Sequence, residues 1–249
     1  MVAKKKASAK TVLILRSCSA NLTSHGDFQW PGVGEVAKAE DWNPTPECGH
    51  GLHGWLYGAG DHSVSEYREK DSKWLVVEVL ESSIVDLGGK VKFPSCTVRC
   101  IGTMKEATDY LIEHEPMSAK VAVIGATICV DNDQVAVVGS LGTATAGYEG
   151  TATAGYLGTA TAGDYGKATA GNYGKATAGY KGTATAGDEG TATAGTLGTA
   201  TAGDKGEIHI CYWDDKASRY RTIIGYIGED GLLPNTAYRL DDAHQFVKV

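Results

Sequence analysis

The chain has 249 residues, a hydrophobic content of 42% and a formal net charge of −7 at pH 7. A chain of this length accommodates one large or two modest globular domains. The modest negative charge gives no basis for binding nucleic acid, so we expect no nucleic-acid partner. Glycine is strongly over-represented at 33 residues, which predicts turns at regular intervals.

Residues 1–10, "MVAKKKASAK", are predicted to form a flexible basic arm. The apolar run that follows has only four residues before Arg16, which is too short for the core of a signal peptide. No stretch of about 20 apolar residues exists that would span a bilayer. We therefore expect no membrane partner and a cytoplasmic location, with a virion as the other possibility.

Residues 11–118 have the texture of an α+β globular domain. Segments rich in β-branched residues and bounded by Gly or Pro predict strands. The segment 104–115 predicts a helix, with Met104, Ala107, Tyr110 and Leu111 on one face. A shorter helix is expected over 63–70. The predicted strands are "TVLIL" (11–15), "KWLVVEVL" (73–80), "IVDLGGKVKF" (84–93) and "CTVRCIG" (96–102).

Residues 142–205 consist of eight tandem octapeptides, each the phrase GTATAG or GKATAG followed by two variable residues. A short fixed period is the signature of a solenoid. Residues 119–141 continue the frame as degenerate first coils, with larger residues in place of Thr and Ala. After the array, "GEIHIC" places Ile208 and Ile210 where the repeat has Ala, and residues 206–249 predict a C-terminal β cap.

The alternation Thr-Ala-Thr-Ala has period two, so it predicts a short strand with Thr on one face and Ala on the other. Lys167 and Lys175 replace the first Thr of two units, and a lysine cannot be packed unpaired inside a narrow coil. Glu207 and His209 continue the Thr face. Thr is therefore expected to point outward and Ala inward.

This orientation defines an outward face with two interruptions, Lys167 and Lys175. We expect Gly, the two variable residues and the next Gly to form a turn, in which Gly supplies φ values that other residues avoid. The variable residues are expected to face solvent. The outward threonines are Thr143, Thr145, Thr151, Thr153, Thr159, Thr161, Thr169, Thr177, Thr183, Thr185, Thr191, Thr193, Thr199 and Thr201.

One unit supplies one strand and one turn, so two units are expected to make a coil of 16 residues. Eight units then give about four coils that span roughly 20 Å at a rise of about 4.8 Å each. The predicted fold is mainly β: a short β-solenoid of two opposed sheets with an Ala-lined interior, an N-terminal α+β domain and a C-terminal β cap.

The phrase "TATAGYEGTATAGY" resembles the repeats of bacterial ice-nucleation proteins, whose 16-residue coils carry Thr-x-Thr and the phrase TAGYGST. The resemblance covers residues 142–205 and implies a β-solenoid with outward Thr-x-Thr rows. In ice-binding solenoids such rows order water into an ice-like lattice through methyl and hydroxyl groups. The array departs from that family in its shortness, in Lys167 and Lys175, and in the missing secretion signal.

The phrase "ECGHGLHGW" (47–55) is similar to a Cys-Gly-x-Gly-Leu-His phrase in the N-terminal domain of uncharacterised phage and bacterial proteins with short-period β-helical repeats. That resemblance implies no established activity. Cys48, His50 and His53 are an alternative metal-ligand set, but no second pair of ligands at zinc-site spacing accompanies them. The other interpretation is a Gly-rich turn with Cys48 and His53 buried and hydrogen-bonded. We expect no metal and no cofactor.

An enzymatic alternative rests on a distant resemblance to ADP-ribosyltransferases, carried by Arg16 at the end of a first strand and Glu78 on a later one. The resemblance implies that Arg16 holds a phosphate and that Glu78 stabilises an oxocarbenium-like centre. The principal interpretation assigns no catalytic residue. The six cysteines form no Cys-x-x-Cys pair and are expected to be free thiols.

The principal functional hypothesis is a non-enzymatic scaffold, a rigid spacer or interaction module that is phage-associated and has a protein partner or self-associates. Ice binding through the outward Thr-x-Thr rows is one alternative, and an N-terminal ADP-ribosyltransferase-like enzyme is the other. Mimicry of DNA by the array is excluded, because residues 142–205 hold five acidic residues against four lysines.

Overall fold

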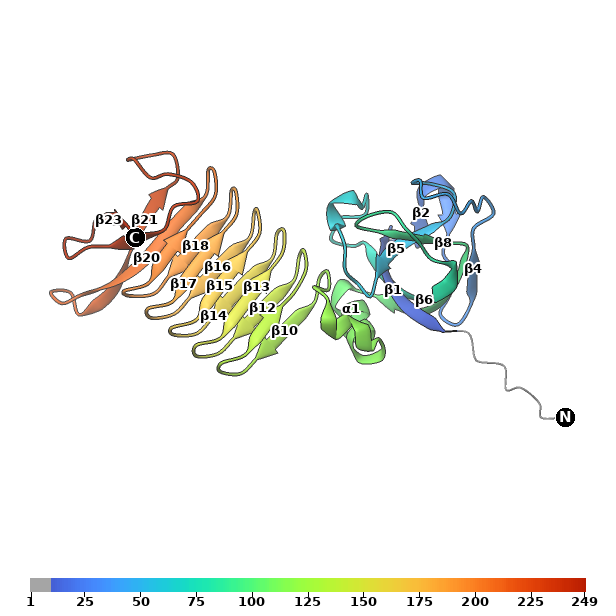
Figure 1. The fold of residues 1–249 in the computed structure, drawn as a ribbon, viewed down its shortest axis with the longest axis horizontal. Coiled ribbons are helices and arrows are strands. Elements are labelled where there is room, and N and C mark those ends of the chain that lie inside the picture. The colour runs from blue at the N-terminus through green and yellow to red at the C-terminus, as the bar shows by residue number, and fades with distance from the viewer. Residues whose placement is uncertain (1–9) are drawn as a thin grey trace. The chain divides into compact units, whose positions relative to one another are not determined.

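The computed structural model describes residues 10–249, so the arm predicted at residues 1–10 lies, except for Lys10, outside the described residues. The chain divides into two compact units, Met1–Val121 and Ala122–Val249. Figure 1 shows the mixed domain of the first unit and the regular coils of the second. The mainly β fold class, with its solenoid and its N-terminal sheet domain with one α-helix, is confirmed.

The first unit is built from an antiparallel sheet and one α-helix. Its sheet has the strand order β4-β9-β6-β1-β5-β8-β7. Its elements are β1 (Thr11–Cys18), β2 (Thr23–Ser24), η1 (His25–Asp27), β3 (Phe28–Gln29), β4 (Val36–Lys38), β5 (Leu52–Leu56), η2 (His62–Val64), β6 (Lys73–Leu80), η3 (Glu81–Ser83), β7 (Val85–Asp86), β8 (Val91–Phe93), β9 (Ser95–Gly102), α1 (Met104–His114) and η4 (Pro116–Lys120).

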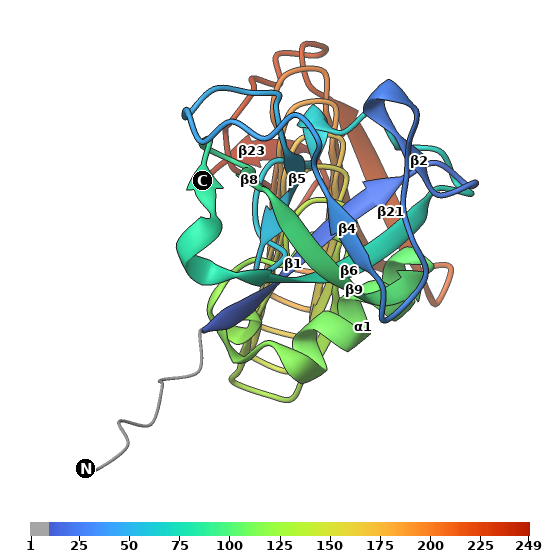
Figure 2. The same cartoon turned by 90° about the vertical axis from the view of Figure 1, so that its right-hand side faces the viewer.

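The helix α1 packs against β1, β6 and β9, as Figure 2 shows from the side of this unit. It buries Ala107, Thr108 and Leu111, and a capping box at Thr103 and Glu106 fixes its start. The opposite face of the sheet carries the main core, in which Ile14, Leu75 and Phe93 are completely buried. In the part of the chain that the structure describes, no helix is long and apolar enough to cross a membrane.

The prediction of a short helix over 63–70 is wrong. The chain forms a single 3₁₀ turn, His62–Val64, and then an irregular segment. Asp61 accepts a hydrogen bond from the Ser63 N–H at 2.8 Å, and the Ser65 hydroxyl accepts one from the Tyr67 N–H at 3.1 Å. Such local side-chain acceptors compete with the helical bonding pattern, which explains the difference.

The second unit is the solenoid with its cap. Its elements are β10 (Thr127–Val130), β11 (Val135–Val137), β12 (Thr143–Ala146), β13 (Thr151–Ala154), β14 (Thr159–Ala162), β15 (Lys167–Ala170), β16 (Lys175–Ala178), β17 (Thr183–Ala186), β18 (Thr191–Ala194), β19 (Thr199–Thr201), β20 (Glu207–Asp214), β21 (Arg219–Tyr226), β22 (Tyr238–Leu240) and β23 (Phe246–Lys248).

Alternate strands of the solenoid belong to two sheets, visible as the stacked arrows in Figure 1, which are parallel through the coils and end in antiparallel strands at the C-terminal cap. The first sheet has the order β10-β12-β14-β16-β18-β20-β21, and the second has β11-β13-β15-β17-β19-β22-β23. Thr143 pairs with Thr159 and Ala144 with Ala160, so each coil contains 16 residues, as expected. The degenerate strands β10 and β11 join the stack, which therefore has about five turns.

The alanines of the array are buried, and the threonines lie partly exposed on the outer faces. Lys167 and Lys175 are exposed on these faces. At the C-terminal end, Ile208 and Ile210 occupy the alanine places and are buried. At the other end, the segment around Val123 closes the coil through a 2.8 Å bond that its carbonyl accepts from the Gly139 N–H.

The expectation that the repeat glycines supply unusual φ values is wrong. No glycine of the array has a positive φ; the second variable residue of each turn has it instead, for example Tyr165 at 58° and Leu197 at 60°. The glycines are required because stacked turns approach closely. A Cβ on Gly163 would lie 2.8 Å from the carbonyl carbon of Gly147 in the preceding coil, and one on Gly195 would lie 2.5 Å from that of Gly179.

Substitutions at two different positions of the repeated turn should therefore have different effects on stability. Gly163→Ala forces a methyl group into the backbone of the preceding coil, so we expect the free energy of unfolding to fall by about 1–3 kcal/mol. Leu197→Asn, at an exposed position with positive φ, should change it by less than about 0.5 kcal/mol or raise it slightly, because Asn tolerates this conformation.

Urea unfolding followed by far-UV circular dichroism measures both changes. Equal destabilisation by the two variants would contradict the assignment of the steric constraint to Gly163.

Candidate functional site

The two outer faces of the solenoid each present two parallel rows of side chains. We call the row from the first residue of each TATA strand the leading row and the row from the third residue the trailing row. In-register pairing of the strands aligns each row along the stack. Neighbouring coils are about 4.8 Å apart, and the two rows are separated by about 6.6 Å along the strand.

All fourteen outward threonines predicted from the sequence lie on these faces. The trailing row is continuous threonine on both sheets. The leading row is interrupted once on each sheet, by Lys175 between Thr159 and Thr191 and by Lys167 between Thr151 and Thr183. The trailing row of the first sheet consists of Thr145, Thr161, Thr177 and Thr193. The trailing row of the second sheet consists of Thr153, Thr169, Thr185 and Thr201.

The turns add a second repeating pattern that the sequence reasoning missed. The Asp164 carboxylate accepts a hydrogen bond from the Tyr180 N–H one coil later at 2.8 Å, and Asp188 does the same for the Asp204 N–H at 2.9 Å. Asn132 accepts one from the Tyr148 N–H at 2.9 Å. The recurrence of Asp and Asn at the first variable place was the available signal. These bonds fix the spacing of the coils that carry the threonines.

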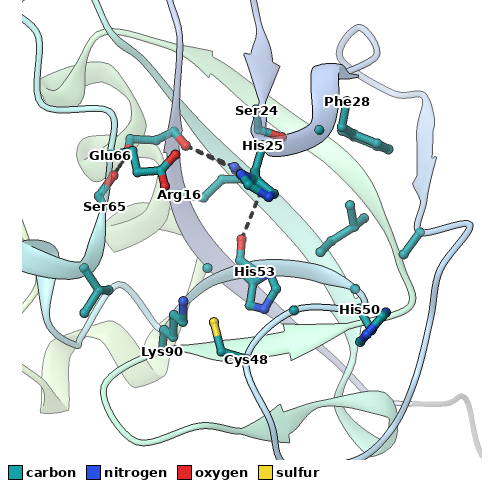
Figure 3. A pocket seen from close by; sticks show the side chains of 18 of the residues that line it. Arg16, Ser24, His25, Phe28, Cys48, His50, His53, Ser65, Glu66 and Lys90 are labelled. Carbon is teal, nitrogen blue, oxygen red and sulfur yellow. Dashed lines mark hydrogen bonds between the residues drawn. The ribbon is translucent and has the colours of Figure 1, made fainter.

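Outside the array, the first unit contains a cavity of about 770 Å³. Figure 3 shows the labelled wall residues Arg16, His53, His25 and Lys90. β1 supplies Arg16, β5 supplies His53, and the segment before β8 supplies Lys90. Gly54 permits this arrangement, because a Cβ there would lie 2.8 Å from the Leu15 carbonyl oxygen of β1.

Arg16 is buried with an exposed fraction of 9%. Its guanidinium donates to the carbonyl of Ser17 at 3.3 and 3.2 Å and to the carbonyl of His53 at 3.1 Å, and it lies 4.0 Å above the ring of Trp30. Burial lowers the pKa of Arg16 to about 10, so it stays charged at neutral pH. Burial raises the pKa of Cys18 to about 11 and that of Cys96 to about 12, so neither neighbouring thiol is a counter-ion.

The alternative metal ligands Cys48, His50 and His53 do not assemble into a site. Within residues 10–249, no three His, Cys, Asp or Glu side chains are placed to hold a metal ion together. Cys48 is exposed, and His50 lies 3.5 Å from Asp41. The expectation that Cys48 is buried is therefore wrong.

His53 does lie partly inside, but its Nε2 atom is buried and lacks a hydrogen-bond partner among the described residues. The prediction that this buried side chain is hydrogen-bonded is therefore also wrong. Burial lowers the pKa of His53 to about 4, which keeps the ring neutral at neutral pH. The loop that carries Cys48 is held by Lys92, which donates to the carbonyls of Glu47 at 2.8 Å and Gly49 at 3.2 Å.

The enzymatic alternative paired Arg16 with Glu78, and the structure does not bring them together. Arg16 pairs with Leu75 across the β1–β6 ladder, and Glu78 pairs with Leu13, so their side chains lie on opposite faces of the sheet. Glu78 lines a different cavity and is bound by Arg99 and by Thr11, which lower its pKa. All six cysteines are free thiols in the structure.

The fold of the second unit defines a class: β-solenoids of 16-residue coils whose two outer faces carry Thr-x-Thr. Comparison with known proteins agrees with this class. The chain is 35% identical to an ice nucleation protein of Pseudomonas fluorescens over 108 residues, which are 43% of this chain and 9% of that protein. It is 33% identical to the ice nucleation protein InaU of Pantoea ananas over 105 residues, or 41% of this chain and 10% of that protein.

A third relative, an ice nucleation protein of Xanthomonas campestris pv. translucens, is 33% identical over 110 residues, or 43% of this chain and 7% of that protein. The resemblance to ice-nucleation repeats is thus confirmed, while the chain spans no more than about a tenth of the length of these relatives. Residues 12–112 match the family described as "Domain of unknown function (DUF7666)". No solved structure matches the chain.

The lowered pKa of His53 predicts an acid-sensitive first unit. The neutral ring is favoured in the folded state, so its contribution to stability is present above the ordinary value of 6.5 and is lost as pH falls toward about 4. The thermal midpoint of the first unit should therefore fall across this range, and His53→Gln should make the fall smaller.

Tryptophan fluorescence reports mainly on this unit, since four of the five tryptophans (Trp30, Trp42, Trp55 and Trp74) belong to it and Trp213 alone belongs to the second unit. His50→Gln, a change at an exposed histidine of the same cavity, serves as the control and should leave the pH dependence as in the parent chain. If the thermal midpoint of His53→Gln fell with pH as steeply as that of the parent chain, the prediction would be contradicted.

Proposed function

We propose that the solenoid binds ice through its outward threonine rows. The observation that carries this proposal is the continuous trailing row on each sheet, which repeats a methyl and a hydroxyl group at every coil. Regularly spaced methyl groups restrict the positions of neighbouring waters, and hydroxyls at the same spacing hydrogen-bond those waters. A rigid backbone lattice presents both groups without an entropic cost of ordering the surface.

The relatives support the proposal. Proteins from three bacterial genera that are named ice nucleation proteins share about a third of aligned positions with some two fifths of this chain. Their name concerns whole proteins, of which the matched residues make up only 7–10%. The relatives therefore support only the chemistry of the repeat. The kind of ice binding that this chain can perform is inferred from the dimensions of its own solenoid.

Those dimensions favour adsorption to ice over nucleation. The threonine-bearing strands belong to four coils, which extend about 20 Å along the stack. An ice embryo has to reach a critical size before it grows, so a small template stabilises only small embryos. A face of this size is sufficient to attach to an existing crystal and block its growth.

The principal sequence hypothesis, an interaction scaffold, remains the second candidate. The observation in its favour is the lysine in each leading row, since Lys167 and Lys175 are exposed and well hydrated. Under this hypothesis the threonines serve only as residues suited to exposed strand positions. The two candidates predict different outcomes for substitutions on the faces.

Replacement of Thr153 and Thr185 by Tyr should abolish most of the ice-binding activity of the second sheet. Both residues belong to its trailing row, and two bulky rings would separate that face from an ice surface. We expect thermal hysteresis and ice shaping to fall by half or more, with the first sheet retaining the remainder. Leu157→Tyr is the matched control, since Tyr already occupies the same turn position at Tyr165 and Tyr173.

Absence of thermal hysteresis in the parent chain at high concentration, or equal activity in the double variant and the parent, would overturn the proposal and favour the scaffold.

Replacement of Lys167 by Thr should have the opposite effect. It completes the leading row of the second sheet between Thr151 and Thr183, so the hysteresis at equal concentration should rise. Lys181→Thr removes the same charge at a turn and should leave the activity unchanged. A rise that is the same in both variants would show that loss of positive charge, and not completion of the row, is responsible.

A further inference from the structure

Arg16 carries a buried positive charge that the protein does not neutralise. Of the described residues, none contributes a carboxylate within 4.0 Å of the guanidinium, and the nearby thiols are neutral. The face of Trp30 provides partial compensation at 4.0 Å. Burial of an unpaired charge is unfavourable unless another group stabilises it, so the site is one that an anion would complete.

The guanidinium also keeps free donors. Arginine has five N–H groups, and three hydrogen bonds to the carbonyls of Ser17 and His53 use Nε, Nη1 and Nη2 once each. One N–H on each terminal nitrogen is left. Free N–H groups of a guanidinium bind the oxygens of a carboxylate or phosphate through charge-assisted hydrogen bonds.

The cavity beside Arg16 has room for an organic molecule and a wall suited to one. Its volume of about 770 Å³ falls in the range of small-molecule sites. Phe28, Leu52 and Val64 contribute apolar surface. His53 adds a neutral ring with an unpaired, buried Nε2 atom in the lining, so the wall contains a second polar group without a protein partner.

The charges around the cavity select the type of anion. Arg16 and Lys90 are cationic, whereas Glu40, Asp41 and Glu66 line the cavity as exposed acids. The surroundings therefore carry one more negative than positive charge. A dianionic phosphate is repelled more strongly by these acids than a carboxylate with a single charge.

We propose that the cavity of the first unit binds a small monoanionic carboxylic acid with an apolar body, its carboxylate held by the two free N–H groups of Arg16. The apolar body lies against Phe28, Leu52 and Val64, and Lys90 adds a second positive charge to the wall of the same cavity. This proposal concerns the first unit alone and is independent of ice binding by the solenoid.

Isothermal titration of the full chain with four probes tests the proposal. Benzoate combines the carboxylate with an apolar ring; benzamide has the same shape without charge; acetate lacks the ring; and phenyl phosphate replaces the carboxylate by a dianion. We expect saturable benzoate binding, with each other probe weaker by about tenfold or more, as expected for loss of charge-assisted hydrogen bonds or of the apolar contact.

Variants locate the site. Arg16→Gln should abolish benzoate binding, and Lys90→Glu should weaken it several-fold. Arg99→Gln, which removes an arginine from the other cavity, should leave it unchanged. If Arg16→Gln does not fold, the Nε–Hε resonance of Arg16 in the parent chain replaces it, and this signal should shift on saturation with benzoate.

Three results would overturn the proposal: no saturable benzoate binding to the parent chain, equal affinity for benzamide, or an unshifted Arg16 signal at saturation. Tighter binding of phenyl phosphate than of benzoate would refute the choice of a carboxylate and assign the site to phosphate esters.

Discussion

The close approach of stacked backbones at the turns determines the rest of the solenoid. At most turns of the array, as at Gly163 and Gly195, the closing glycine of one coil lies against the closing glycine of the coil before it, with no room for a Cβ atom between them. Peptide hydrogen bonds cross this contact, as in the 3.1 Å bond from the Gly163 N–H to the Gly147 carbonyl. A contact this close requires the coils to repeat at one fixed length, and the 16-residue register follows from it. The same constraint explains why the interior is lined by alanine, because coils with two-residue turns leave space for methyl groups only.

The orientation of the array could be predicted from the sequence because it depends on local periodicity and on a few charged exceptions. Lys167 and Lys175 exclude one face from the interior, and Ile208 and Ile210 identify the other. The role of the glycines could not be predicted in the same way. Positive φ and close approach both favour Gly, and only the three-dimensional stack shows that the positive φ belongs to residues such as Tyr165. The sequence located the turns correctly, but the positive φ was assigned to glycine and belongs to the second variable residue.

The cavity of the first unit could not be predicted, for a related reason. Arg16, His53 and Lys90 are separated by more than 70 residues, and they meet only because β1, β5 and the segment before β8 lie side by side in the sheet. The sequence singled out Arg16 and His53 for different chemistry, as a phosphate ligand and a metal ligand, each with a partner that the fold places elsewhere. Strand parity separates Arg16 from Glu78, and that parity depends on a pairing register that one sequence does not reveal.

The two sites that we propose differ in their means of recognition. The first encloses a single charged group whose remaining hydrogen-bond donors point to a discrete partner. The second repeats a weak, neutral group many times at a spacing set by the backbone. A threonine row gains selectivity only from this repetition, since each hydroxyl alone is bound equally well by liquid water. The continuity of a row therefore matters more than the number of threonines in it. The trailing rows contain no lysine on either sheet. They are therefore the part of the surface on which the regular spacing of the coils coincides with an unbroken series of identical side chains.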